Sequence, residues 1–220
     1  MKRIGNIYSK LCDKNNIKIA ILKASAGKKS RKNVVKIMNN IDYYVDDIYK
    51  MLVDKSIKLS PYKKMKIHDG VNKKERIIFK PAFYPDQVIH WCIMLQLQPI
   101  LEKGMYEYCC ASVPNRGIHY GGKYIKKILV NDRKNTKYAL KLDVKKFYPS
   151  INKEIMKRKF MRVIKDRDTL DLIDKIIDSS ESGLPIRKLY FTMVCKFLFA
   201  RCRPFYKGRN EGKILFKIYG

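Results

Sequence analysis

The chain has 220 residues, enough for one sizeable folded domain that needs no disulfide framework. Hydrophobic residues make up 46% and aromatic residues 11%, which provides a core and excludes wholesale disorder. Lysine and arginine number 49 against 20 acidic residues, and a net charge of +29 favours a polyanionic partner: RNA, DNA or an anionic membrane surface.

The sequence predicts a cytoplasmic protein with reduced thiols. No apolar run approaches the roughly 20 residues that cross a bilayer, and the amino-terminal segment lacks the apolar stretch of a secretory signal. The 6 cysteines include no Cys-x-x-Cys pair, and the 3 histidines are too scattered to complete a zinc site. We therefore expect mostly buried, reduced cysteines.

The first half of the chain predicts helices around one hairpin. Gly27-Lys28 lies in a basic surface stretch and lacks the earlier glycine of a phosphate-binding loop, because Leu22 occupies that position. Residues 62–80 are typical of a hairpin with a tight turn at Asp69-Gly70. Before it, one amphipathic helix is predicted by an apolar spacing of three and four residues: Val34, Met38, Ile41, Val45, Ile48 and Leu52.

The middle of the chain predicts a buried helix followed by a loop and a basic helix. Asp86 is placed to cap a helix over residues 87–97, and Pro99 is expected to lead the chain into a loop. The glycines near residues 117–122 predict a further loop, before a basic helix over residues 124–130.

Residues 137–143 fit a short buried strand, which is followed by two helices. Asn152 is placed to cap a helix over residues 154–164, and a second helix follows Asp168. Asp143 ends the strand, and a carboxylate at a buried strand end needs a cation to offset its desolvation. Two interpretations stay open: an ion pair with a following lysine, or a hard divalent cation such as Mg²⁺.

Four collinear segments resemble reverse transcriptases. ALKLDVKKFYPSI, residues 139–151, resembles the first catalytic motif of these enzymes, especially the bacterial ones related to group II intron, retron and diversity-generating enzymes. KERII with PAFYPDQVIHW resembles the fingers motifs, residues 97–122 resemble the block before the catalytic strand, and GLPI, residues 183–186, resembles the opening of a later motif. The resemblance covers roughly residues 1–186.

The resemblance implies an α+β fold, with the fingers and partial palm of a right-hand polymerase truncated before its Tyr-x-Asp-Asp hairpin. It divides the chain into a basic N-terminal helical region (1–60), a fingers-like region (61–135), a partial palm with the Asp143 strand (136–186) and an aberrant basic tail (187–220). The implied function is RNA-directed DNA synthesis, in which dNTPs are added to a DNA primer on an RNA template.

The resemblance also implies the site. Asp143 would be catalytic and would bind Mg²⁺, or Mn²⁺ in its place, together with the backbone carbonyl of Val144. Arg76 would bind the nucleotide triphosphate, and Tyr148 would lie beneath the incoming sugar. The alternatives are a solvated hairpin arginine and a packing aromatic. Weaker contacts to nucleic acid are expected from four basic residues: Lys74, Arg116, Lys145 and Lys146.

The family pattern breaks after residue 186. No Tyr-x-Asp-Asp motif occurs, and the only Asp-Asp pair is Asp46-Asp47, before Asp143. Residues 187–220 hold nine basic residues and one acid, Glu211. Permitted codons for this tail, read one base later, encode GNYTSQWFAN and end at a Tyr-Met-Asp-Asp, as the family requires. We therefore expect a frameshifted, truncated chain that is inactive alone. The alternatives are a non-catalytic basic RNA-binding protein, and a basic membrane-surface or ribosome-associated protein.

Sequencing the gene for a few hundred bases past codon 186 is expected to show that series of codons, with the family motifs in the shifted frame. A nucleotide series that is incompatible with those codons would contradict the frameshift hypothesis.

Overall fold

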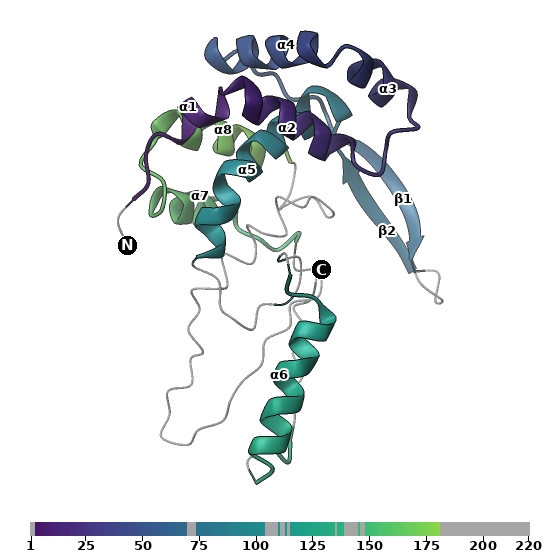
Figure 1. Ribbon diagram of the computed structural model, residues 1–220, viewed down its shortest axis with the longest axis vertical. Coiled ribbons are helices and arrows are strands. Elements are labelled where there is room, and N and C mark those ends of the chain that lie inside the picture. The colour runs from purple at the N-terminus through teal and green to yellow at the C-terminus, as the bar shows by residue number, and fades with distance from the viewer. Residues whose placement is uncertain are drawn as a thin grey trace.

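Helices make up most of the structure, and its two strands form one antiparallel hairpin (Figure 1). The computed structural model describes residues 3–69, 74–103, 110, 113, 115–134, 136–138, 145 and 148–180. Within these residues the mixed composition is compatible with the α+β class. The helices and strands are α1 (Ile7–Leu11), α2 (Lys14–Ser25), α3 (Lys32–Asn39), α4 (Ile41–Val53), β1 (Lys63–Asp69), β2 (Lys74–Lys80), η1 (Phe83–Gln87), α5 (Val88–Glu102), α6 (Ile118–Asn131), α7 (Lys153–Met161) and α8 (Arg167–Asp178).

Helix α5 lies at the centre of the core. It packs against α1, α2 and η1, and α2 packs in turn against α4. Its buried side chains occupy several faces of the helix, as expected of a helix covered on most sides; they are Val88, Ile89, His90, Cys92, Ile93, Met94, Leu97 and Leu101. The predicted burial of this helix is confirmed.

Helix α5 also runs further than the sequence predicts. Pro99 was expected to begin a loop, but it lies inside the helix, which continues to Glu102. A proline inside a helix costs about 3 kcal/mol, because it removes one backbone hydrogen bond and crowds the preceding turn. Burial of Leu101, 1% exposed, offsets much of that cost at roughly 1.5–3 kcal/mol. Tertiary packing therefore overrides the local signal.

The start of α5 differs from the predicted cap. Gln87 occupies the N-cap position and makes no side-chain capping bond. Asp86 is instead 2% exposed, and its Oδ1 accepts a hydrogen bond from the backbone N–H of Ser60 at 3.2 Å. The chain turns through η1, where Tyr84 has an extended backbone and the Tyr84–Pro85 peptide is cis. This turn carries the carboxylate of Asp86 inward, away from the helix end it was expected to cap.

The single helix predicted from Val34 is two helices, α3 and α4. All six of its predicted apolar positions are buried or partly buried against the core, so the face was correctly identified. The break lies at Asn40, whose backbone is non-helical (φ −128°, ψ 43°). Its side-chain amide donates to the carbonyl of Lys36 at 3.4 Å. Asparagine side chains compete with the helix in this way, and a pattern of apolar spacing does not record it.

The hairpin forms, but its turn is not the predicted one. His68 pairs with Glu75 and Asp69 with Lys74, so the connection runs through residues 70–73, outside the described residues. A tight turn centred on Asp69-Gly70 would place Met65 opposite Lys74. The observed register instead pairs Met65 with Ile78, and it allows an ion pair between Lys66 and Glu75 at 2.9 Å. Cross-strand side-chain pairing therefore decides the register.

Helices α7 and α8 begin close to where the sequence predicts. The side chain of Asn152 caps α7 by accepting from the backbone N–H of Ile155 at 3.0 Å, which confirms that cap. Helix α8 buries an apolar face that includes Ile173 and Ile176, both 0% exposed.

The two ends of the described chain are joined by polar contacts. Ile4 pairs with Ile164 in a parallel bridge, and the backbone N–H of Tyr8 donates to Oδ2 of Asp166 at 2.6 Å. The hydroxyl of the buried Thr169 donates to the same oxygen at 2.9 Å. Tyr8 in turn donates its hydroxyl to the carbonyl of Leu52 at 2.7 Å, and burial raises the pKa of Tyr8 to about 12. The segments around Tyr8, Leu52 and Asp166 are therefore joined to one another by hydrogen bonds through Tyr8.

Helix α6 extends away from the helical body in Figure 1, and none of its residues is buried. The predicted basic helix is confirmed, but it starts at Ile118, so Gly121 and Gly122 are helical rather than part of a loop. A Cβ atom at position 121 would lie 3.1 Å from Sγ of Cys110. Glycine at position 121 therefore lets the thiol of Cys110 approach the helix closely. This close packing offsets the low helix propensity of glycine.

None of the described helices combines the length and the apolar character that a membrane span requires. The predicted strand over residues 137–143 lies largely outside the described residues.

Asp166→Ala is expected to lower the free energy of unfolding by about 1–3 kcal/mol, because it leaves the amide of Tyr8 and the hydroxyl of Thr169 without their shared acceptor. The matched control is Asp168→Ala, on the same helix, which removes only an exposed ion pair with Lys55 and should cost about 0–1 kcal/mol. Urea denaturation of both variants measures the difference. Equal losses would show that Asp166 does not join the two segments.

Candidate nucleic-acid interface

The structure describes only part of the predicted site. Asp143, Val144 and Lys146 lie outside the described residues, so the metal site and its Mg²⁺ remain predictions. Lys74 and Arg76 occupy backbone positions in β2, and their side chains lie outside the described set. Among the side chains that the structure does describe, no group of three or more His, Cys, Asp or Glu could hold a metal ion. A two-metal centre therefore has no ligand set among them.

The three cysteines that the structure describes are thiols and not half-cystines. Cys92 is fully buried, while Cys12 and Cys110 are half-buried. Burial raises the pKa of both Cys92 and Cys12 above the ordinary thiol value, so these two cysteines are protonated and poor nucleophiles at neutral pH. The prediction of reduced thiols is confirmed for these three residues, and Cys109, Cys195 and Cys202 lie outside the described range.

The hairpin exposes lysines on both faces. On one face, Lys66 pairs with Glu75, and the ammonium of Lys64 lies 5.8 Å from the ring centroid of Phe79. On the other face, Lys63 and Lys80 are directly opposite each other in the register. Like charges in that position destabilise a hairpin. The base of the hairpin therefore concentrates positive charge rather than balancing it.

Lys28 brings a third cation to this base. Gly27 adopts a left-handed backbone (φ 68°), which is accessible to glycine at little cost, and it turns the chain at the end of α2. The Lys28 ammonium donates to the carbonyl of Ala24 at 2.9 Å and to Oε1 of Gln87 at 2.6 Å. It also lies 5.6 Å from the ring centroid of Phe83. Burial, followed by the nearby charges of Arg31 and Lys80, lowers the pKa of Lys28.

We call Lys28, Arg31 and Lys80 the junction cluster, because they gather where the turn between α2 and α3 meets the end of β2. The sequence did not predict this cluster. It indicated a basic surface stretch around Lys28 and, separately, a hairpin over residues 62–80. The signal present in the sequence was the density of lysine and arginine after Gly27. The contact with Gln87, 59 residues further along, could not be read from that pattern.

Arg116 lies in a second basic region at the start of α6. Its backbone N–H donates to the carbonyl of Val113 at 3.1 Å, and its guanidinium lies 5.9 Å from the ring centroid of Tyr120. The rings of Tyr120 and Tyr124 are 4.9 Å apart. Exposed lysines follow along the helix at positions 123, 126 and 127. Basic groups interleaved with aromatic rings suit the phosphates and bases of a single strand.

Tyr148 and Lys145, both predicted site residues, lie in different surroundings. Lys145 is exposed. Tyr148 is 8% exposed and belongs to the hydrophobic core cluster, and its carbonyl accepts from the N–H of Ile151 at 3.4 Å. This burial is what the packing interpretation of Tyr148 requires. The placement of Tyr148 beneath a nucleotide sugar stays a prediction.

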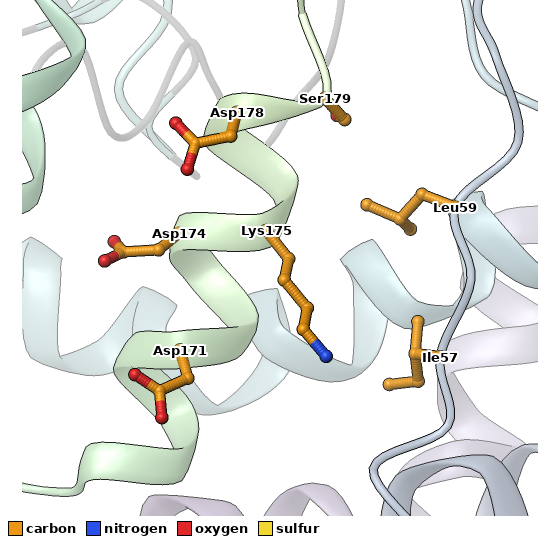
Figure 2. A pocket seen from close by; sticks show the side chains of 7 residues that line it. All are labelled: Ile57, Leu59, Asp171, Asp174, Lys175, Asp178 and Ser179. Carbon is orange, nitrogen blue, oxygen red and sulfur yellow. The ribbon is translucent and has the colours of Figure 1, made fainter.

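A shallow pocket of about 440 Å³ lies between α8 and the segment after α4. Figure 2 shows Lys175 extending toward Ile57, while the carboxylates of Asp171, Asp174 and Asp178 project from the other side of the helix. The residues that line it are Ile57, Leu59, Asp171, Asp174, Lys175, Asp178 and Ser179.

The carboxylates beside this pocket serve the packing of α7 against α8. The ammonium of Lys157 lies 2.8 Å from Asp178, and burial raises the pKa of Asp174 while the charge of Lys157 lowers it. On the side of the pocket that faces Ile57 and Leu59, α8 contributes Lys175, while the three carboxylates lie on the other side of the helix. No metal-binding group occurs among these or the other described side chains.

No protein-family model matches this chain, and the comparison with curated proteins likewise gives no match.

Tyr148→Ala is expected to lower the free energy of unfolding by about 3–5 kcal/mol, because it removes a buried aromatic ring from the core. Tyr138→Ala is the matched control, since Tyr138 is 94% exposed and its removal should change stability by less than about 0.5 kcal/mol. Guanidinium denaturation followed by circular dichroism compares them. If Tyr148→Ala is as stable as the control, Tyr148 does not support the core.

Proposed function

We propose that this chain is the fingers and partial palm of an RNA-directed DNA polymerase, a nucleotidyltransferase that binds an RNA template and a DNA primer. Its four family-like segments occur in the family order, and this collinearity supports the proposal. The observation that supports it is the position of Arg76 on the second strand of a hairpin whose described lysines are exposed: Lys63, Lys64, Lys66 and Lys80. A fork of N–H donors at that position suits the phosphates of a nucleotide.

Each predicted residue has a distinct task in this proposal. Arg76 holds the triphosphate of the incoming dNTP, and Tyr148 bounds the pocket for its sugar. Asp143 and the carbonyl of Val144 hold Mg²⁺, or Mn²⁺ in its place, which supplies positive charge next to the primer hydroxyl when bound. Lys74, Arg116, Lys145 and Lys146 contact backbone phosphates, which orient the duplex without reading its sequence.

The 220-residue chain is proposed to bind without polymerising. It contains Asp143 but no Tyr-x-Asp-Asp motif, so a second pair of carboxylates for the metals is missing from its sequence. One carboxylate and one carbonyl hold a divalent cation weakly. Purified chain, primer, template and Mg²⁺ are therefore expected to give complexes but no extended product.

The second candidate function is non-catalytic RNA binding, which the net charge of +29 and the exposed lysines of β1 and α6 favour. Both candidates bind RNA. They differ in whether the chain binds a nucleotide triphosphate in a way that depends on Mg²⁺, Asp143 and Arg76.

We expect the chain to bind an RNA–DNA hybrid with an affinity that falls roughly 50- to 150-fold between 50 and 200 mM NaCl, as about four neutralised phosphates would cause. Fluorescence anisotropy measures this. Titration calorimetry with a dNTP and Mg²⁺ should then show binding that is lost in Asp143→Asn and in Arg76→Gln but kept in the matched charge control Lys134→Gln.

The outcomes separate the two candidates. Hybrid binding with no Mg²⁺-dependent nucleotide binding would leave only the RNA-binding function. Clear primer extension by the purified 220-residue chain would refute the expected inactivity, and weak, salt-independent binding of the hybrid would contradict both candidates.

A further inference from the structure

The base of the hairpin carries positive charge that the described structure leaves unbalanced. The junction cluster of Lys28, Arg31 and Lys80 gathers three cations from separate segments. None of the ion pairs formed by described residues involves any of the three. Lys28 bonds only neutral oxygens, and Lys63 lies opposite Lys80 in the register. Four positive groups thus meet here, and the described residues contribute no ion pair to offset them.

This arrangement is unfavourable for the isolated protein. Partial burial of an ammonium disfavours its charged form, and the charges of Arg31 and Lys80 repel it further, so the pKa of Lys28 is lowered. A cross-strand Lys63–Lys80 pair weakens the hairpin, because like charges directly opposite each other repel. An anion at the cluster would reverse each of these costs, because the same charges would then be attracted to it.

Hydrogen bonds hold the Lys28 side chain and the backbone next to Arg31 and Lys80 in place. The side-chain amide of Gln87 accepts from Lys28 and, through Nε2, donates to the carbonyl of Pro81 at 3.0 Å. One amide therefore links Lys28 to the residue that follows Lys80. Two successive turns, in which Lys28 N–H donates to Ser25 and Arg31 N–H donates to Lys28, set the spacing between the two basic residues.

The hairpin favours a long polyanion over a single small anion. By strand alternation, positions 76 and 80 belong to one face of β2, together with Lys63 on β1. Four residues of strand span roughly 13 Å at about 3.3 Å per residue. A row of cationic positions of that length suits successive phosphates along one strand of nucleic acid.

We propose that Lys28, Arg31 and Lys80, with Lys63 beside them, form a binding site for the backbone phosphates of an RNA strand at the base of the hairpin. The four members of the site are not among the residues assigned to nucleotide or metal, although the row on β2 ends at position 76, which is assigned to the nucleotide. The site involves no chemical step. It rests on the proposed function only for the choice of RNA as the ligand.

The test compares two double variants that lose the same charge. Arg31→Gln with Lys80→Gln removes two exposed members of the cluster and spares the buried contacts of Lys28. Lys10→Gln with Lys50→Gln removes two exposed lysines of α1 and α4. Circular dichroism and thermal melting establish that both remain folded, and anisotropy with a single-stranded RNA between 50 and 300 mM NaCl measures binding.

The cluster variant should bind RNA about 25-fold more weakly at 100 mM NaCl, and its plot of log affinity against log salt should be shallower by about 1.4, the slope of two single-strand phosphate contacts. The control variant should stay close to the unmodified chain in both quantities. In a second readout, RNA should protect Lys63 and Lys80 from an amine-reactive reagent, detected by mass spectrometry, and should leave Lys10 and Lys50 reactive.

Other outcomes overturn the site. Equal weakening in both double variants would show a diffuse effect of net charge. Competition by millimolar inorganic phosphate alone would indicate a small-anion site, and loss of binding only to phosphatidylserine vesicles would indicate a membrane surface. If the cluster variant binds RNA as the unmodified chain does, this site fails while the proposed function stands; if the unmodified chain binds no RNA, both fail.

Discussion

The burial of helix α5 is the constraint on which the rest of the structure depends. Its apolar residues occupy several faces, so the chain must cover it with α1, α2 and η1. This requirement positions the chemistry as well as the core. Gln87 directly precedes α5, and its amide connects the end of the hairpin to the turn after α2. The hairpin base is therefore aligned with Lys28 as a consequence of how α5 is covered.

The distribution of charge follows a second rule. Acidic residues in the helical body find nearby lysines, as Asp46 does with Lys14 and Asp42 with Lys18, and these exposed pairs contribute little stability. At the hairpin base, cations meet cations and neutral oxygens. A protein with a net charge of +29 has few acidic residues, and in the described part of the chain none of them forms an ion pair with the junction cluster. Positive charge is therefore concentrated at the hairpin base. A polyanion is the partner that such a concentration of charge attracts.

The differences between expectation and structure have two causes, one local and one tertiary. The apolar spacing from Val34 identified the correct buried face but not the break at Asn40, where a side-chain hydrogen bond competes with the helix. Pro99 and Asp86 carry strong local signals for a helix end and a helix cap, yet packing around α5 overrides both. The tight turn predicted at Asp69-Gly70 does not form, because the strands adopt a register that pairs Met65 with Ile78. At Pro99, Asp86 and Asp69-Gly70, contacts with residues elsewhere in the chain outweigh a local preference worth about 1–3 kcal/mol, whereas at Asn40 the competing hydrogen bond is itself local.

Local sequence alone determined the features that depend on neighbouring residues: the cap at Asn152, the apolar face of α8, the burial of α5 and the presence of a basic hairpin. These follow from periodicity and from short-range hydrogen bonding, which operate within one or two turns. Only the tertiary structure decided that Tyr8 would meet Asp166 and that Lys28 would meet Gln87, because these contacts join segments 158 and 59 residues apart. Spacing along a chain records which faces are apolar, but it does not record which distant polar groups become neighbours when those faces are buried together.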